Sequence, residues 1–386
     1  MVKPFLSERM QGIERTLLRQ INDQADSSCI NLGLGEPSFP TPKSILNHLK
    51  QKVEDWNLGY SPNEGIQKLR KLIAEKSGLE VAADQICVTV GAEEALFTAL
   101  MVIMNSGDEA LIPNPGFPAY ESIVKIAGGI AKSYQLYREN NFSLKYEHVK
   151  KNITKKTKAI ILNSPNNPSG AVYSSEELMK LAKLLEKRSI IAISDEVYRD
   201  IYFEERPDSI ANYVRNYLVV NSLSKSYSMT GWRLGWCIAP PELSKPLANF
   251  HQLAVACAPK ISQKVALFAL KGFAEKEKMH NIEELRRRRD LAMSCVEKYT
   301  DLEYVKPSGT FYMFIDVLSK IPKYGNSLEI SLSLLSKEKV VTIPGLAFGK
   351  GGEGYLRISF ASPPEQIEEG IRRIGHFFGV RPRKLQ

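Results

Sequence analysis

From residue 86 onward, short runs of β-branched residues alternate with longer segments in which apolar residues recur at helical spacing. The runs predict strands at residues 86–90, 110–112, 159–162, 190–194, 218–221 and 235–239. Helices are expected between most of them, for example at residues 92–105, 120–127 and 175–187. The strands are apolar on both faces, and such strands separated by helices are typical of a mainly parallel sheet covered by helices. The pattern therefore predicts an α/β fold.

The order of elements changes beyond about residue 290. Strands are expected at residues 311–317, 340–343 and 355–360, with helices at 328–337 and 364–378. This order predicts a smaller α+β domain, to which the N-terminal segment returns. A chain of 386 residues is long enough for two or three domains. We assign residues 1–45 to an N-terminal segment that joins the small domain, residues 46–285 to a large domain, and residues 286–386 to the small C-terminal domain.

The excess of basic residues is modest and is not concentrated on one face. The formal net charge is +9, and the densest basic run, Arg286 to Arg289, lies in a segment with apolar residues at helical spacing. Successive side chains of a helix point about 100° apart, so these arginines spread around the helix. No stripe of alternating basic and aromatic residues accompanies them. We therefore expect a solvated helix here and no nucleic-acid partner.

The cysteines and histidines give no sign of a disulfide framework or a metal centre. The five cysteines are widely spaced and include no CxxC pair, and the five histidines are equally scattered. This usage fits a reducing compartment. The N-terminus lacks the apolar core of a signal peptide, and no stretch reaches the roughly 18 uncharged apolar residues of a membrane span. We therefore expect a cytoplasmic protein with no membrane partner and no metal.

A lysine follows the strand expected at residues 218–221. Lys225 lies in the segment Ser222-Leu-Ser-Lys-Ser-Tyr-Ser-Met-Thr-Gly-Trp-Arg233. A lysine near the end of a sheet can lose its hydration, which lowers its pKa and makes the neutral amine available for a Schiff base. Ser222, Ser224 and Arg233 are close enough in sequence to converge on a phosphate. Taken alone, Lys225 would be a solvated surface lysine.

An aspartate ends another strand that should be buried. Asp195 follows residues 190–194, and an aspartate is almost never buried without a cationic or hydrogen-bonding partner. A protonated pyridine nitrogen would be such a partner. The alternative is that Asp195 caps the N-terminus of a following helix.

Two turns after strands offer further polar groups. Gly91 and Ala92 open the helix expected at residues 92–105, where free backbone amides and the helix dipole favour an anion. The turn Asn163-Ser-Pro-Asn-Asn-Pro-Ser-Gly170 follows another strand and offers amide side chains. Taken alone, it would be a plain turn. In open α/β sheets, ligands bind at the carboxyl ends of the strands, where all of these groups are expected to lie.

The combination of these segments resembles the class I and II aminotransferases, which are fold-type I enzymes that use pyridoxal 5'-phosphate. The resemblance runs from about residue 31 to residue 375. Its motifs, in family order, are Gly35-Glu-Pro, Tyr60-Ser-Pro-Asn-Glu-Gly, Asn166-Asn-Pro-Ser-Gly, Asp195-Glu-Val-Tyr, Ser222-Leu-Ser-Lys, Gly231-Trp-Arg-Leu-Gly and Tyr355-Leu-Arg-Ile-Ser. Each motif is weak alone, but the whole series in order is specific. The resemblance implies a mainly parallel, seven-stranded-type sheet in a large cofactor-binding domain.

The resemblance also implies roles for individual residues. Lys225 would bind the cofactor covalently and then move the proton between the substrate carbon and the cofactor. Asp195 would pair with the pyridine nitrogen, and Asn167 and Tyr198 would hydrogen-bond the phenolic oxygen. Lys225, Asp195 and Tyr198 are thus the expected catalytic residues.

The remaining expected contacts concern the phosphate, the ring and the substrate. The phosphate would be held by Gly91, Ala92, Ser222, Ser224 and Arg233. Phe117 would stack on the ring, and Tyr60 would reach the phosphate of a neighbouring subunit, which implies a homodimer with shared sites. Arg357 would grip the substrate α-carboxylate as a bidentate pair, assisted by the Gly35 backbone and by Asn167.

The function expected from the resemblance is transfer of the α-amino group of an L-amino acid to a 2-oxo acid such as 2-oxoglutarate. The alternative is a lyase, decarboxylase or synthase of the same fold, because the same groups support related carbanion chemistry. Aspartate-using relatives often have a lysine directly after the two phosphate-binding turn positions, where this chain has Glu93. That difference leaves the amino donor open.

Overall fold

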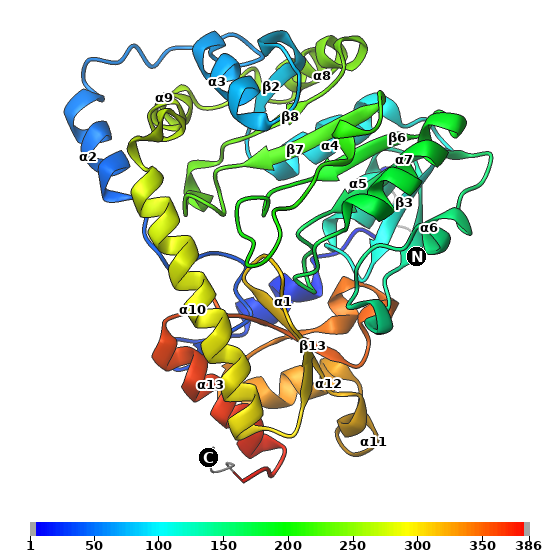
Figure 1. Cartoon of the computed structure of the whole chain (residues 1–386), viewed down its shortest axis with the longest axis vertical. Coiled ribbons are helices and arrows are strands. Elements are labelled where there is room, and N and C mark those ends of the chain that lie inside the picture. The colour runs from blue at the N-terminus through cyan, green and yellow to red at the C-terminus, as the bar shows by residue number, and fades with distance from the viewer. Residues whose placement is uncertain (1–4, 382–386) are drawn as a thin grey trace.

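The computed structural model describes residues 5–381, and a large sheet dominates it (Figure 1). The seven strands lie in the order β2-β8-β7-β6-β5-β3-β4, and only β8 is antiparallel to its neighbours. Their bounds are β2 (Ile86–Thr89), β3 (Glu109–Asn114), β4 (Ile130–Gln135), β5 (Thr157–Asn163), β6 (Ile191–Asp195), β7 (Tyr217–Ser222) and β8 (Gly235–Ile238). The predicted α/β fold with a mainly parallel sheet is therefore confirmed.

Helices cover both faces of this sheet. Ile161 of β5 packs toward α4 and α5, whereas its neighbour Ile160 packs toward α7, as alternation along a strand requires. The helices of this part are α2 (Lys43–Lys52), α3 (Gln67–Ser77), α4 (Ala92–Ile103), α5 (Ala119–Ile126), α6 (Tyr146–Lys150), α7 (Ser175–Arg188), α8 (Pro241–Val255) and α9 (Lys260–Phe268). No helix within residues 5–381 is long and apolar enough to cross a membrane.

One strand of the large sheet was not predicted. Strand β4 lies at the edge, and its sequence Ile-Ala-Lys-Ser-Tyr-Gln is largely half-buried or exposed. An edge strand pairs on one side only and needs no two-sided apolar run. The prediction relied on such runs, so it missed β4.

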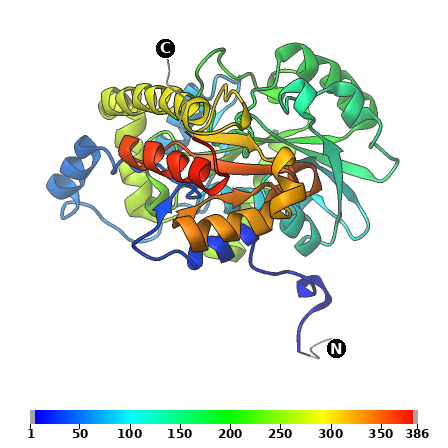
Figure 2. The same cartoon turned by 90° about the horizontal axis from the view of Figure 1, so that it is seen from below.

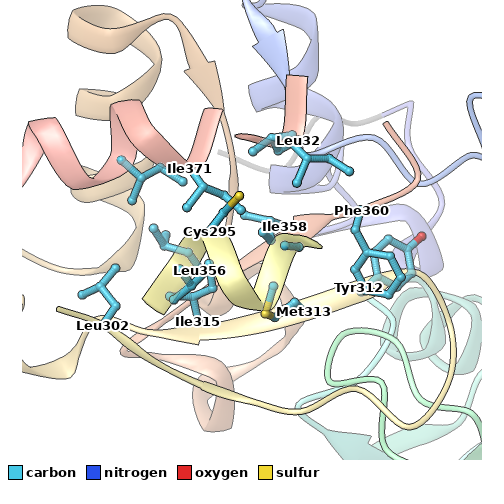
Figure 3. Packing of buried hydrophobic residues seen from close by; sticks show 14 of the residues in the cluster. Leu32, Cys295, Leu302, Tyr312, Met313, Ile315, Leu356, Ile358, Phe360 and Ile371 are labelled. Carbon is cyan, nitrogen blue, oxygen red and sulfur yellow. The ribbon is translucent and has the colours of Figure 1, made fainter. Parts of the chain in front are cut away.

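A second, antiparallel sheet forms the lower part of the molecule in Figure 1. Its order is β12 (Ile343–Pro344), β13 (Tyr355–Ser359), β10 (Tyr312–Asp316) and β9 (Glu303–Val305). Helices α10 (Glu275–Tyr299) and α13 (Pro364–Phe377) pack on it, and Figure 3 shows Cys295 and Ile371 from these helices against Leu356 and Ile358. The part also contains α11 (Ile321–Tyr324) and α12 (Ser327–Ser333), which runs into a π-helical turn at Leu334–Glu338.

The N-terminal segment does return to this second part. Strand β1 (Ile30–Asn31) pairs in parallel with β11 (Val340–Val341), and helix α1 (Leu17–Asp23) precedes it. The strand predicted at residues 340–343 is therefore two strands, because β11 pairs with β1 whereas β12 pairs with β13. Figure 2 shows the segment before α1 extending away from the rest of the chain. The division at residue 285 stays a prediction; it falls inside α10, which runs beside both parts in Figure 1.

The interpretation of the arginine run as a solvated helix is wrong for two of its members. Arg288 and Arg289 on α10 are buried. Arg288 donates hydrogen bonds to the Ser38 hydroxyl and to the backbone oxygens of Ala361 and Ser362. A buried guanidinium is tolerated when its donors are satisfied in this way. These two arginines tie α10 to the neighbouring loops.

Candidate active site

A cavity of about 410 Å³ lies where the carboxyl ends of β5, β6 and β7 meet the second sheet. The side chains that close each strand come together here: Asn163 from β5, Asp195 from β6 and Ser222 from β7. The other predicted residues in its wall are Gly35, Ala92, Phe117, Asn167, Tyr198, Ser224, Lys225, Arg233 and Arg357, together with Glu93. The sheet therefore gathers groups that are far apart in sequence.

Lys225 lies in the wall of this cavity, half-buried rather than on the open surface. Its Nζ donates a hydrogen bond of 2.7 Å to the backbone oxygen of Gly35. Burial, followed by the guanidinium groups of Arg357 and Arg233, lowers the pKa of Lys225 to about 8. The alternative of a solvated surface lysine is therefore wrong, and a substantial fraction of the amine is neutral near physiological pH.

Asp195 is 5% exposed and reaches the cavity from the end of β6. Its Oδ2 accepts a 2.6 Å hydrogen bond from the hydroxyl of Tyr120, and its Oδ1 accepts one from the Val197 amide. Burial raises the pKa of Asp195 to about 6, although these hydrogen bonds oppose the shift. Residues 197–200 form a turn, so the alternative of a helix N-cap is excluded.

The turn between β2 and α4 forms a close-fitting cradle. Gly91 has φ of +85°, a conformation that favours glycine, and no side chain caps the first amides of α4. A Cβ on Gly91 would lie 2.6 Å from Nη2 of Arg233, and one on Gly235 would lie 2.6 Å from the amide nitrogen of Ala92. Ser222 and Ser224 border the same cavity. Because Gly91 and Gly235 have no side chains, the Ala92 amide and the Arg233 guanidinium can lie close to this turn.

Arg357 on β13 is fully buried and has no acidic partner among the described residues. Its guanidinium donates to Oδ1 of Asn167 at 2.9 Å and to the backbone oxygen of Gly33 at 2.7 Å, while its Nε has no partner. The guanidinium also lies 4.1 Å from the centre of the Tyr312 ring. A buried, uncompensated cation at a cavity wall is a ready receptor for a carboxylate.

Two predicted residues do not line the cavity. Gly91 is absent from its wall but directly precedes Ala92, which is part of it, so its role at the phosphate stays a prediction. Tyr60 is 88% exposed and lies outside it. Its predicted contact with a second subunit stays a prediction.

Several cavity residues were not predicted. Tyr120 holds Asp195, Tyr312 exchanges a 3.0 Å hydrogen bond with Tyr198, and Asn163 donates to the backbone oxygen of Asp195. Helix α1 contributes Leu18, Arg19 and Asn22, and Leu34, Glu36, Leu96, Val197 and Thr230 complete the wall. Tyr120 begins the helix predicted at residues 120–127, and Asn163 begins the turn that contains Asn167, so both lie beside predicted features. Nothing local marks α1 as part of the site.

Comparisons with known proteins agree with this geometry. The model of the family described as "Aminotransferase class I and II" matches residues 27–374. A probable aspartate aminotransferase of Methanocaldococcus jannaschii is 39% identical, covering 97% of this chain and all of the relative. An aromatic-amino-acid aminotransferase of Thermococcus litoralis is 34% identical, covering 96% of this chain and 97% of the relative. The structure of the Thermus thermophilus aspartate aminotransferase with maleate superimposes with a TM-score of 0.91 at 31% identity, covering 96% of this chain and 99% of that one.

The two sheets and the cavity between them define the architecture of a fold-type I enzyme. The chain belongs to the class I and II aminotransferase family. The predicted function, movement of an amino group between an amino acid and a 2-oxo acid, is confirmed at this level, and the alternative of a lyase, decarboxylase or synthase is not favoured.

Proposed function

We propose that the cavity binds pyridoxal 5'-phosphate and that an L-α-amino acid and a 2-oxo acid then react there in turn. The observation that carries this proposal is one arrangement of charges. A buried cation without an acidic partner, Arg357, and a buried carboxylate, Asp195, border the same cavity as the low-pKa amine of Lys225. Charged groups gathered in this way at the wall of one cavity are typical of a catalytic site.

The residues present fit this cofactor. The cradle at Gly91 and Gly235 would accept the phosphate on the Ala92 amide, with the guanidinium of Arg233 opposite. The hydroxyls of Ser222 and Ser224 would complete the contacts. Free backbone amides at a turn and at the start of a helix form a concave site that binds anions.

Asp195, Phe117, Asn167 and Tyr198 would orient the ring. Pyridoxal phosphate supplies a protonated ring that takes up the electrons left when the substrate loses its α-proton. The carboxylate of Asp195 would keep that ring proton in place, and the hydrogen bond from Tyr120 favours the ionised carboxylate against the opposing effect of burial. Asn167 and Tyr198 would hydrogen-bond the phenolic oxygen, and Phe117 would cover one face.

Lys225 would have two tasks. Its neutral amine would first hold the cofactor covalently. When the substrate takes that place, Nζ would accept the proton from the substrate α-carbon and pass it to the cofactor. The pKa of about 8 leaves Nζ able to do both near neutral pH. The Gly35 carbonyl, which accepts from Nζ, would hold the amine within the cavity.

We also propose that the enzyme is a homodimer with shared sites. Tyr60 is 88% exposed, and Leu253, near the end of α8, is 86% exposed. Lys260 at the start of α9 donates from Nζ to the Tyr60 backbone oxygen. Large apolar or aromatic side chains exposed to this extent would be covered at an interface between two subunits. Sedimentation of the purified protein would test this, and a monomer that retains full activity would contradict it.

The activity itself is tested by mixing the purified protein with a panel of L-amino acids and 2-oxoglutarate. We expect glutamate and the matching 2-oxo acid to form in equal amounts. Release of pyruvate and ammonia without any acceptor would instead support elimination. A panel without any reaction, at full cofactor loading, would overturn the proposal.

Replacing Arg357 by lysine should chiefly weaken substrate binding. Lysine keeps the positive charge but cannot make the paired hydrogen bonds of a guanidinium. We expect KM for the amino acid to rise about tenfold to a hundredfold, with a smaller effect on kcat. Arg288→Lys is the matched control, because Arg288 is also buried and bonded to backbone oxygens but lies outside the cavity. An unchanged KM in Arg357→Lys would show that the carboxylate binds elsewhere.

Replacing Glu93 by lysine should improve the use of aspartate. Glu93 lines the cavity, and its negative charge would repel a side-chain carboxylate, so aspartate should be a poorer donor than neutral, aromatic or basic amino acids. Exchanging this charge should raise kcat/KM for aspartate roughly tenfold to a hundredfold. Arg19 lines the same wall, so Arg19→Ala, which removes a positive charge, should act in the opposite direction. Rapid turnover of aspartate by the unmutated enzyme would contradict the inference from Glu93.

A further inference from the structure

A buried cluster of polar side chains lies directly behind the phosphate cradle. Glu94, in the first turn of α4, reaches back so that its Oε2 accepts a 3.0 Å hydrogen bond from the Val90 amide. Its Oε1 accepts from the hydroxyl of Thr98 at 2.7 Å and lies 3.1 Å from Nδ1 of His251. The His251 side chain, on α8, is completely buried. Through Glu94, the cluster therefore links Val90, just before α4, with Thr98 on α4 and with His251 on α8.

The position of Glu94 excludes a direct role in the site. Its neighbours Ala92 and Glu93 line the cavity, whereas Glu94 does not. Hydrogen bonds from His251, Thr98 and the Val90 amide outweigh the effect of burial and hold the pKa of Glu94 below its ordinary value. The Glu94 carboxylate is thus ionised, largely buried, with its side chain 14% exposed, and absent from the wall of the cavity.

The turn at residues 90–92, which Glu94 holds through the Val90 amide, is also closely packed on its other sides. Gly91 lies under the Arg233 guanidinium, and Gly235 of β8 packs so closely that a Cβ there would lie 2.6 Å from the Ala92 amide nitrogen. The Thr89 hydroxyl donates to the Gly91 backbone oxygen at 2.9 Å. On the α8 side, the bond from the Val90 amide to Glu94 fixes the same turn. A small displacement of such a turn misplaces its amides, and hydrogen bonds weaken steeply with poor geometry.

We propose that Glu94, held by His251 and Thr98, is a positioning residue that fixes residues 90–92 for the cofactor phosphate. The inference rests on the proposed function and extends it to residues that touch neither cofactor nor substrate. Its consequence is selective: losing the cluster weakens the contacts to the phosphate but leaves those to the ring and to Lys225 in place. If the cluster contributed only to the stability of the fold, its loss would not weaken binding of the phosphate more than binding of the ring.

The test compares two ligands of the cofactor-free protein. Pyridoxal 5'-phosphate and pyridoxal carry the same ring and aldehyde, so the ratio of their dissociation constants isolates the phosphate. In Glu94→Ala we expect this preference to fall about tenfold or more, equivalent to about 1.4 kcal/mol per factor of ten, with pyridoxal affinity unchanged. Glu94→Gln keeps an oxygen for the Val90 amide and should recover most of the preference.

The histidine gives an independent pair of variants. Asparagine at position 251 places an amide nitrogen near the position of Nδ1, whereas leucine removes the donor. His251→Leu should therefore lose the preference for the phosphate, and His251→Asn should retain it. This pair decides the question if Glu94→Ala does not fold.

Glu109→Ala serves as the matched control. Glu109 is a buried carboxylate bonded to Lys132 and Thr154 at the far end of β3, so its loss should lower Tm without changing the ratio. An equal loss of both affinities in the Glu94 and His251 variants, or an unchanged ratio, would overturn the inference while the proposed function stands. An unmutated protein that shows no preference for the phosphate compound would overturn both.

Discussion

Lys225→Ala should abolish turnover while the protein still folds and retains the cofactor weakly. The variant loses both the covalent attachment and the group that moves the substrate proton, so kcat should fall by about three or four orders of magnitude. The unmutated protein, loaded with pyridoxal phosphate, should absorb in the visible, and borohydride should fix the cofactor to the peptide that contains residues 222–233. Label on any lysine outside this peptide would show that the assignment is wrong.

The pKa of Lys225 adds a pH dependence to this result. Because burial lowers the pKa to about 8, the charged amine loses its proton well below the pH at which an ordinary lysine does. The rate at which the cofactor-free protein captures the aldehyde should therefore rise with pH and level off above about pH 8. Lys278→Ala is the control, because Lys278 is also largely buried but lies outside the cavity, and both its capture rate and its turnover should match the unmutated enzyme.

Asp195→Asn should leave the fold intact and remove most of the activity. The Oδ1 of asparagine can still accept from the Val197 amide, and its Nδ2 can donate to the Tyr120 hydroxyl, but asparagine supplies no negative charge to hold the ring proton. Removing one member of a buried charge pair typically costs 3 to 5 kcal/mol, so we expect a loss in kcat of about a hundredfold or more. Stopped-flow measurement of a single half-reaction with excess amino acid would locate the loss in the proton-removal step.

Glu196→Gln is the matched control for this variant. Glu196 is the adjacent buried acid, but it bonds to Ser194, Ser209 and Arg199 and does not line the cavity. Its replacement should lower stability and leave the half-reaction nearly unchanged. Near-normal turnover in Asp195→Asn would mean that Asp195 only shapes the turn after β6.

The sequence by itself predicted the features that depend on one segment at a time. Two-sided apolar runs predicted the central strands, because a strand buried on both faces has few other compositions available. The motifs at the ends of those strands, together with the resemblance, predicted about half of the cavity wall, since the carboxyl ends of parallel strands meet at one edge of the sheet. Lys225, Asp195 and Ser222 were singled out by their positions at or just after strand ends, and the resemblance supplied their expected roles.

Only the tertiary structure decided what covers each element. Arg357 meets Asn167 across 190 positions, and Tyr120 meets Asp195 across 75, distances over which sequence spacing carries no information. The same limit hid the edge strand β4, the contribution of α1 to the cavity, and the burial of Arg288 and Arg289. Periodicity reports which face of an element is apolar, but partners are selected by packing between elements that the chain brings together from a distance. The sequence determines which residues carry a charge. Whether that charge is solvated, paired or available to a ligand is decided by the residues that the fold packs around it.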